Sequence, residues 1–233
     1  MRLLILDIDG VMIDAERSFM EAVARALADL APSLPWSEAH FRAFKRAGTF
    51  NDDFRLTAAA LALHEAGQLD ALRDSETWSF FYLEPRIAEL YEVAREAVRR
   101  HYEHTRRQEQ ALITLPELEA TGWALAICTG RPPDELDMAF GVLGFELPFV
   151  CDSEPRFRKP RPDGLLHLAE RFGTRQILFV GDTRDDATAL RAARELRPDL
   201  EWRFAAIGPD RERIAQPGDL QEESLRKLLP RLS

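Results

Sequence analysis

Leu3-Leu4-Ile5-Leu6-Asp7-Ile8-Asp9-Gly10, near the start of the sequence, has the pattern of a buried strand that ends in a turn. In open α/β sheets, ligands bind at the carboxyl ends of the strands. At such a position the carboxylates of Asp7 and Asp9 can hold a hard cation through oxygen or attack an electrophile. Acidic residues are also common in turns. Taken alone, this segment indicates either a turn or a functional site.

Apolar runs of strand length recur in the second half of the sequence and alternate with helical patterns. The strand-like runs are Trp123–Cys128, Phe149–Cys151, Ile177–Val180 and Phe204–Ile207. The segments with apolar residues at spacings of three and four are Asp134–Leu143, Gly164–Phe172 and Asp185–Leu196. Repeated β-α units predict a parallel sheet with helices on both faces. The predicted fold class is α/β, a doubly wound, Rossmann-like and mostly parallel sheet, and a closing helix is expected over Gln221–Leu232.

A long helical block separates the first strand from the others. Its helical patterns are Phe19–Leu30, Glu38–Arg46, Asp53–Ala66 and Arg86–Arg107, and no strand-like run interrupts them. Such a block between the first strand and its sheet neighbours indicates an insertion. We therefore predict an α/β core domain of residues 1–13 and 108–233 and a helical cap domain of residues 14–107.

Composition narrows the class of protein. The 233 residues are 45% hydrophobic and 30% charged, which is typical of globular proteins, and no apolar stretch approaches the roughly 20 residues of a membrane span. The first residues lack the cleavage region of a signal peptide, so the expected location is the cytoplasm. A net charge of −9 argues against a nucleic-acid partner. Cys128 and Cys151 lack metal-site spacing and are expected to be reduced core residues.

A second acidic group follows a later strand, in Val180-Gly181-Asp182-Thr183-Arg184-Asp185-Asp186. Because parallel strands end at the same edge of a sheet, we expect Asp7, Asp9, Asp182 and Asp186 to lie around one cation. Oxygen ligands without histidine or cysteine favour Mg²⁺. Capping of the following helix accounts for one or two of these carboxylates. It does not require three within five residues.

Two further motifs lie at or near strand ends. Thr129-Gly130-Arg131 follows an apolar run, and its hydroxyl, backbone amide and glycine allow an anion to approach closely. Lys159 lies just before a predicted helix, in extended backbone set by the prolines around it. Each of these motifs is weak alone, since Thr-Gly is frequent in turns and a loop lysine is usually solvated.

Four motifs follow one another along the chain: Asp-x-Asp-Gly-Val, Thr-Gly, Lys-Pro and Gly-Asp-Thr-x-x-Asp. With these motifs in this order, the chain resembles the haloacid dehalogenase superfamily of phosphatases and phosphotransferases over its whole length. The inserted block resembles the helical, C1-type cap of the phosphoglycolate phosphatase-like subfamily. Within it, Lys45-x-x-Gly48-x-x-Asn51-Asp52 is similar to a subgroup of small phosphatase-like proteins.

The resemblance implies a Mg²⁺-dependent phosphatase that acts on a small phosphorylated metabolite. Asp7 would attack phosphorus and carry an aspartyl-phosphate, and Asp9 would exchange protons with the leaving group and with water. Mg²⁺ would bind the Asp7 carboxylate, the Asp9 main-chain carbonyl and Asp182, and Asp186 would support the metal site or Lys159.

The resemblance also assigns the residues that bind substrate. Thr129, Gly130 and Lys159 would bind the phosphoryl oxygens. The candidates for recognising the rest of the substrate are Lys45, Asn51, Asp52 and Arg131. The oligomeric state stays open between monomer and homodimer.

Other functions compete with this one. A dehalogenase has no alcohol to protonate and does not need Asp9. A receiver-type signalling domain needs neither a second Asp two residues after the first nor a long insertion. The intact set of Asp7, Asp9, Thr129, Lys159 and Asp182 argues against a catalytically silent binding scaffold. A phosphomutase of the same superfamily stays open as the alternative.

Overall fold

The structure, a computed structural model, describes residues 2–47, 50, 52–74 and 81–232. The chain divides into two compact units, which are described separately below. Unit 1 comprises Met1–Asp14 and Gln110–Ser233, and unit 2 comprises Ala15–Glu109. The chain passes from one unit to the other after Asp14 and again after Glu109. These positions lie one and two residues beyond the boundaries predicted from the sequence.

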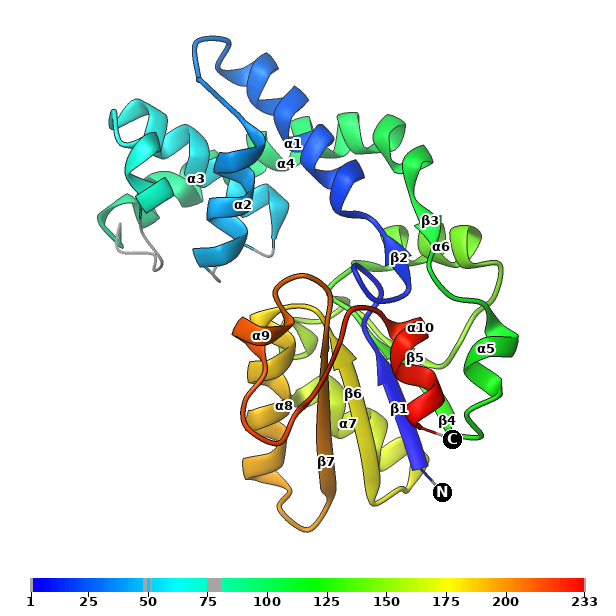
Figure 1. The fold of residues 1–233 in the computed structure, drawn as a ribbon. Coiled ribbons are helices and arrows are strands. Elements are labelled where there is room, and N and C mark those ends of the chain that lie inside the picture. The colour runs from blue at the N-terminus through cyan, green and yellow to red at the C-terminus, as the bar shows by residue number, and fades with distance from the viewer. Residues whose placement is uncertain (1, 48–49, 51, 75–80, 233) are drawn as a thin grey trace. The chain divides into compact units, whose positions relative to one another are not determined.

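Unit 1 is built on a six-stranded parallel sheet in the order β5-β4-β1-β6-β7-β8. Its strands are β1 (Arg2–Leu6), β4 (Ala124–Cys128), β5 (Phe149–Val150), β6 (Gln176–Gly181), β7 (Glu201–Ile207) and β8 (Leu220–Glu222). In Figure 1, β1 lies inside the sheet, next to β6. A separate antiparallel ribbon pairs β2 (Ile13–Asp14) with β3 (Gln110–Ala111). These pairings confirm the predicted α/β, Rossmann-like fold class.

Helices alternate with the strands of unit 1. They are α5 (Leu115–Glu119), α6 (Pro133–Leu143), α7 (Asp163–Phe172), α8 (Arg184–Leu196), α9 (Arg211–Ile214) and α10 (Leu225–Leu228), with short 3₁₀ turns η4 (Pro155–Phe157) and η5 (Leu229–Arg231). Leu165 of α7 and Leu190 of α8 share one core cluster with Leu3 and Ile5 of β1. Leu4 and Leu6 alternate with them and are also fully buried. Since successive strand side chains face opposite sides, both faces of β1 are covered.

The described secondary-structure elements of unit 2 are all helices or 3₁₀ turns. Its elements are α1 (Glu16–Leu30), α2 (Glu38–Ala47), α3 (Asp53–Glu65), η1 (Leu69–Asp74), η2 (Phe81–Leu83), α4 (Glu84–Thr105) and η3 (Arg106–Gln108). Every residue of α3 from Leu56 to Leu63 is buried, which makes α3 the central helix of the unit. Phe44 and Phe50 pack edge to face in the same core, with ring centroids 5.0 Å apart.

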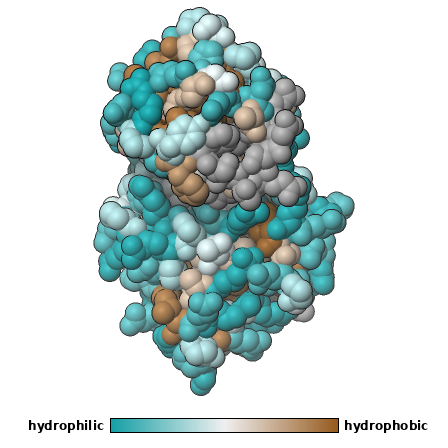
Figure 2. Space-filling model, turned by 90° about the vertical axis from the view of Figure 1, so that its left-hand side faces the viewer, coloured by the Kyte–Doolittle hydropathy of each residue, from teal (hydrophilic) through white to brown (hydrophobic). Residues whose placement is uncertain are grey.

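On the face shown in Figure 2, hydrophilic residues predominate and hydrophobic ones are scattered. Unit 2 also carries surface ion pairs, among them Arg86 with Glu65 and with Glu89. No described helix is long and apolar enough to cross a membrane.

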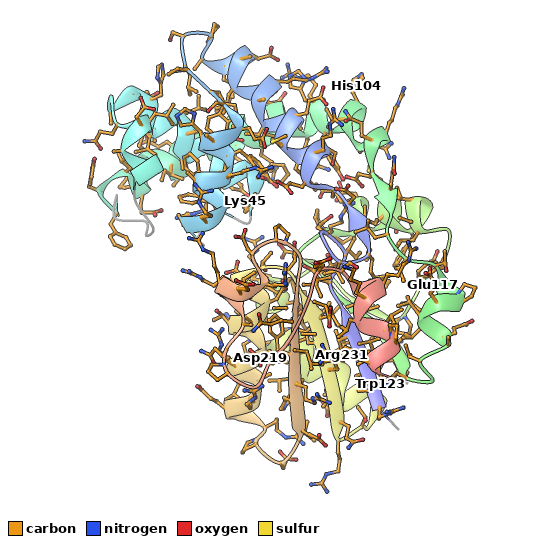
Figure 3. The ribbon with its side chains drawn as sticks, viewed as in Figure 1. Lys45, His104, Glu117, Trp123, Asp219 and Arg231 are labelled. Carbon is orange, nitrogen blue, oxygen red and sulfur yellow. The ribbon has the colours of Figure 1, made fainter. Side chains whose placement is uncertain are left out.

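The C-terminal segment differs from the prediction of a closing helix over Gln221–Leu232. Its first residues form the edge strand β8, because their backbone groups pair with β7. Ser224 then caps the short helix α10, and Trp123 donates a 3.1 Å hydrogen bond from Nε1 to the Leu232 carbonyl. Figure 3 shows Trp123 near this segment. The prediction failed because an edge strand of three residues carries little hydrophobic pattern of its own.

Candidate functional site

Three neighbouring strands of unit 1 end at the same edge of the sheet, and each is followed by a predicted site residue. Leu6 of β1 is in register with Ile127 of β4 and with Val180 of β6. Asp7 comes directly after Leu6. Thr129 comes two residues after Ile127, and Asp182 comes two residues after Val180. The Asp7 amide continues the ladder by donating to the Val180 carbonyl at 3.0 Å.

Asp7, Asp182 and Asp186 form an acidic cluster at this edge. Each offers a carboxylate oxygen, and these three oxygens lie within 4.8 Å of one another. Asp186 is fully buried and Asp7 is 5% exposed. Carboxylates are the ligands that hard cations such as Mg²⁺ prefer. The structure thus brings together three of the four acidic residues predicted from the sequence.

Lys159 is the ammonium group inside this cluster. Its Nζ lies 2.9 Å from Asp7 Oδ2 and 2.6 Å from Asp186 Oδ1. The lysine side chain is only 9% exposed. One ammonium therefore faces three buried or half-buried carboxylates, and the cluster has an excess of negative charge.

Burial and this excess charge shift the pKa values of the cluster. Burial raises the pKa of Asp7 to about 7; the Lys159 ammonium opposes the rise, and the Asp186 and Asp9 carboxylates add to it. Burial likewise raises the pKa of Asp182 well above its usual range, with Asp186 and Asp7 contributing. Burial alone would lower the pKa of Lys159, but Asp186 and Asp7 hold it well above its ordinary value. Lys159 is therefore a fixed cation.

The acidic cluster meets the requirements of a cation site. Asp182 Oδ1 is buried and has no hydrogen-bond partner among the described residues. A buried carboxylate oxygen without a partner costs free energy unless a ligand satisfies it. Gly10 has φ of +69°, and a Cβ there would lie 1.9 Å from Asp182 Oδ2, so only glycine lets the loop approach this carboxylate. The donor set and the unsatisfied oxygen both fit Mg²⁺.

Asp186 has two partners within unit 1. Its Oδ2 accepts hydrogen bonds from the Thr183 amide at 3.0 Å and the Thr183 hydroxyl at 2.6 Å, which completes a capping box at the start of α8. Its Oδ1 accepts from Lys159. A Cβ at Gly181 would lie 2.5 Å from the Asp186 Cβ, so glycine is needed there too. Helix capping and lysine binding are combined in one residue.

Thr129 and Gly130 lie at the end of β4. Thr129 is 1% exposed, and its amide donates to the Val150 carbonyl at 3.0 Å. Its Oγ1 accepts a 3.2 Å hydrogen bond from the Arg131 amide, which leaves the hydroxyl proton for another acceptor. A Cβ at Gly130 would lie 4.0 Å from the Lys159 Cε, so the glycine backbone and the lysine are neighbours.

Asp9 has a different partner from the other acidic residues. Arg131 Nη2 donates to Asp9 Oδ1 at 2.6 Å, and Arg131 Nε lies 3.1 Å from both Asp9 oxygens. From its place in the sequence Arg131 is a candidate substrate contact; in the structure its guanidinium group binds Asp9. The pairing of β1 with β4 brings these two residues together, and the sequence offered no direct sign of it.

The remaining candidates, Lys45, Asn51 and Asp52, belong to unit 2. Lys45 lies on α2 (Figure 3), and its Nζ is 2.9 Å from Asp53 Oδ1. Asp52 caps α3 by accepting from the Phe54 and Arg55 amides through Oδ1, and its Oδ2 accepts from the Tyr91 hydroxyl at 2.9 Å. Asn51 lies outside the described residues. Protein contacts alone account for the position of the Asp52 carboxylate.

Comparison with known proteins identifies similar chains. Residues 1–194 match the sequence profile of the haloacid dehalogenase-like hydrolases. A phosphoglycolate phosphatase from Escherichia coli (strain K12) is 33% identical over 130 residues, which cover 51% of this chain and 48% of that protein. The chain thus spans about half the length of the curated relatives it matches.

Solved structures also resemble the fold. A hydrolase from Pseudomonas syringae superposes with a TM-score of 0.68 at 21% identity, covering 100% of this chain and 98% of the other. The phosphatase Tt82 from Thermococcus thioreducens superposes with a TM-score of 0.65 at 21% identity, covering 89% and 93% of the two chains. At these identities the likeness is one of fold.

Proposed function

This chain belongs to the haloacid dehalogenase-like hydrolase family, and we propose that it is a Mg²⁺-dependent phosphatase that acts on a small phosphorylated metabolite. The observation that carries the proposal is the buried cluster at the edge of the sheet. There the carboxylates of Asp7 and Asp182 lie together, Lys159 Nζ is 2.9 Å from Asp7, and the Thr129 hydroxyl, which follows the adjacent strand, can still donate its proton. This arrangement provides a nucleophile, a cation site and phosphate donors together.

Asp7 is the proposed nucleophile. Its Oδ1 accepts a 2.8 Å hydrogen bond from the Ile8 amide and its Oδ2 accepts from Lys159, so the carboxylate has one orientation. One Asp7 oxygen attacks phosphorus and forms an aspartyl-phosphate as the bond to the leaving oxygen breaks. A fixed nucleophile avoids the entropic cost of ordering it during the reaction.

Asp9 is the proposed proton carrier. Its side chain is 37% exposed, so a leaving group and water can reach it. It donates a proton to the leaving oxygen and later removes one from the water that hydrolyses the aspartyl-phosphate. The two aspartates thus divide the work between covalent and proton transfer.

Lys159, Thr129 and Gly130 are assigned to the phosphoryl oxygens. The ammonium, the hydroxyl and a glycine backbone offer donors where negative charge spreads in the transition state. Asp186 holds Lys159 through its 2.6 Å contact. Lys159 is buried, so its charge acts with little screening by water.

Asp7, Asp182 and the Asp9 main-chain carbonyl are the proposed Mg²⁺ ligands, with Asp186 beside them. The unsatisfied Asp182 Oδ1 supports this assignment. When bound, Mg²⁺ supplies positive charge that reduces the repulsion between an anionic nucleophile and an anionic phosphate. It also balances the excess of carboxylates over ammonium in the cluster.

We assign selection of the substrate to unit 2, proposed as the family's helical cap. The cluster in unit 1 recognises the phosphoryl group, which every phosphate monoester shares. Lys45, Asn51 and Asp52 stay as candidate substrate contacts. Relatives named phosphoglycolate phosphatase make phosphoglycolate the first compound to test.

The proposal is tested by Mg²⁺-dependent release of inorganic phosphate from p-nitrophenyl phosphate. We expect Asp7→Asn to lower turnover by about 10³-fold or more while the fold is kept, since it removes the nucleophile. Asp199→Asn, which changes an exposed carboxylate paired with Arg197, is the matched control. Undiminished turnover in Asp7→Asn would overturn the assignment of the nucleophile.

The same assay identifies the substrate and separates phosphatase from phosphomutase. A panel of phosphoglycolate, sugar phosphates, histidinol phosphate and nucleotides gives the preferred compound from kcat/KM. Release of phosphate without a bisphosphate activator supports the phosphatase. A requirement for such an activator, with transfer to another hydroxyl of the sugar, identifies a phosphomutase.

A further inference from the structure

Arg131 donates more hydrogen bonds to one oxygen of the Asp9 carboxylate than to the other. Asp9 Oδ1 accepts from Arg131 Nη2 at 2.6 Å and from Nε at 3.1 Å. Asp9 Oδ2 accepts only the shared Nε contact at 3.1 Å among the described hydrogen bonds. The two oxygens are therefore unequal, and Oδ2 has more capacity left for another partner.

The guanidinium group of Arg131 is itself held in place. The Arg131 amide donates to Thr129 Oγ1 at 3.2 Å, and the Arg131 carbonyl accepts from the Asp152 amide at 3.0 Å. Nη1 donates to the Glu135 carbonyl of α6 at 3.4 Å. These contacts fix the backbone and the far side of the side chain, so the arginine can orient a carboxylate without rearranging.

Exposure separates the roles of the two residues. The side chain of Arg131 is 1% exposed, whereas that of Asp9 is 37% exposed. A ligand can therefore reach Asp9, but the arginine has almost no surface left for one. The loop that carries Asp9 is also tight, since the Met12 and Ile13 amides both donate to the Ile8 carbonyl.

We propose that Arg131 is a positioning residue that holds Asp9 through Oδ1 and presents Oδ2 to the leaving oxygen. The inference rests on the proposed phosphatase function and replaces the earlier interpretation of Arg131 as a substrate contact. A planar guanidinium suits this task because its donors match a carboxylate and fix its plane.

The step that depends on this geometry is departure of the leaving group. An Asp7 oxygen forms a bond to phosphorus, and the leaving oxygen departs with the electron pair of the broken P–O bond. The proton on Asp9 Oδ2 passes to that oxygen and makes it a neutral alcohol. In the second step, water bonds to phosphorus and gives a proton to Asp9, and the Asp7 oxygen leaves with the electron pair of its bond to phosphorus.

The test compares two substrates that differ in their need for a proton. An alkyl phosphate has a poor leaving group and needs protonation, whereas 2,4-dinitrophenyl phosphate releases a stable anion. We expect Arg131→Met to lower kcat/KM by about 100-fold for the alkyl phosphate and by about threefold or less for the dinitrophenyl ester, because general acid catalysis contributes about 10²–10⁴. Asp9→Asn should show the same selectivity, and the double variant should lose little more than Asp9→Asn alone.

Two further variants serve as controls. Arg197→Met removes an exposed arginine that makes two 2.8 Å hydrogen bonds to Asp199, and we expect wild-type kinetics on both substrates. Arg131→Lys keeps a cation without the planar donors, so its loss on the alkyl phosphate should be intermediate. It also provides the comparison if Arg131→Met does not fold, which a thermal melt reveals.

Three outcomes contradict the proposals in distinguishable ways. Equal losses on both substrates mean that Arg131 acts only on structure and overturn the inference. A higher KM with unchanged kcat for the alkyl phosphate makes Arg131 a substrate contact and also overturns it. If wild-type protein with Mg²⁺ hydrolyses neither ester, the proposed function fails, and the inference fails with it.

Discussion

Each unit of the chain contains a lysine whose Nζ lies 2.9 Å from an aspartate oxygen, yet the two pairs differ in their surroundings. In unit 1, Lys159 and Asp7 are 9% and 7% exposed, and a second carboxylate binds the same ammonium. In unit 2, the side chain of Lys45 on α2 is 31% exposed, whereas that of Asp53, the first residue of α3, is 9% exposed. Distance and burial of the aspartate therefore do not distinguish the two pairs; burial of the lysine and the balance of charge do.

The difference indicates what makes a carboxylate cluster functional. Water reaches the Lys45 ammonium and screens its charge, and an ion pair screened in this way contributes about 0–1 kcal/mol to stability. A buried cluster with more carboxylates than cations is costly without a further cation. Bound Mg²⁺ would supply that cation, which is why the cluster in unit 1 supports the proposed metal site.

Replacing each lysine by methionine gives the largest expected contrast. We expect Lys159→Met to destabilise the protein by about 3–5 kcal/mol, since buried carboxylates lose their partner, and to lower kcat by about 10²–10³-fold. Lys45→Met should cost about 1 kcal/mol or less with kcat unchanged on p-nitrophenyl phosphate. Urea denaturation measures the change in stability, and phosphate release measures the change in kcat. Equal effects of the two substitutions would show that burial of the lysine does not set the energetic importance of the two lysine–aspartate pairs.

Binding of Mg²⁺ is expected to stabilise unit 1 through Asp182. At a concentration about 100 times its dissociation constant, Mg²⁺ should add about 2.7 kcal/mol of stability. Asp182→Asn should abolish this thermal shift, whereas Asp53→Asn in unit 2 should keep it. A full Mg²⁺ shift in Asp182→Asn would remove Asp182 from the ligand set.

The acidic cluster of unit 1 should also make the stability of the protein depend on pH. Burial raises the pKa of Asp7 to about 7, so between about pH 4 and pH 7 the folded protein holds a proton that the unfolded chain has lost. Stability in EDTA should therefore fall as pH rises through this range. Asp7→Asn should flatten the fall, and saturating Mg²⁺ should oppose it. Stability that rises with pH over this range in EDTA would contradict the direction of the shift.

Asp52 provides the smallest expected effect. Because it caps α3 through the Phe54 and Arg55 amides, Asp52→Ala should cost about 1 kcal/mol. Asp52→Asn keeps a capping oxygen and should be nearly neutral. Thermal melts measure the cost. A KM that rises in Asp52→Asn for the preferred metabolite, but not for p-nitrophenyl phosphate, would show that Asp52 contacts the leaving group.

Much of the fold followed from sequence patterns. The apolar run Leu3–Leu6 predicted a strand, and β1 includes it with both faces buried. The family identified from the motifs around Asp7, Thr129, Lys159 and Asp182 was correct. The ribbon of β2 and β3 and the edge strand β8 were not predicted, because elements of two or three residues have no detectable periodicity.

The sequence by itself determined the order of the longer strands and helices along the chain and the position of carboxylates at strand ends. Local apolar periodicity and turn residues are sufficient for that. Only the tertiary structure decided that Lys159 is buried between Asp7 and Asp186 and that Arg131 binds Asp9. It also decided that Asp182 Oδ1 has no hydrogen-bond partner within the part of the chain that the structure describes. Such contacts depend on the register between strands that are distant in sequence, and an ångström-scale change in register would break them.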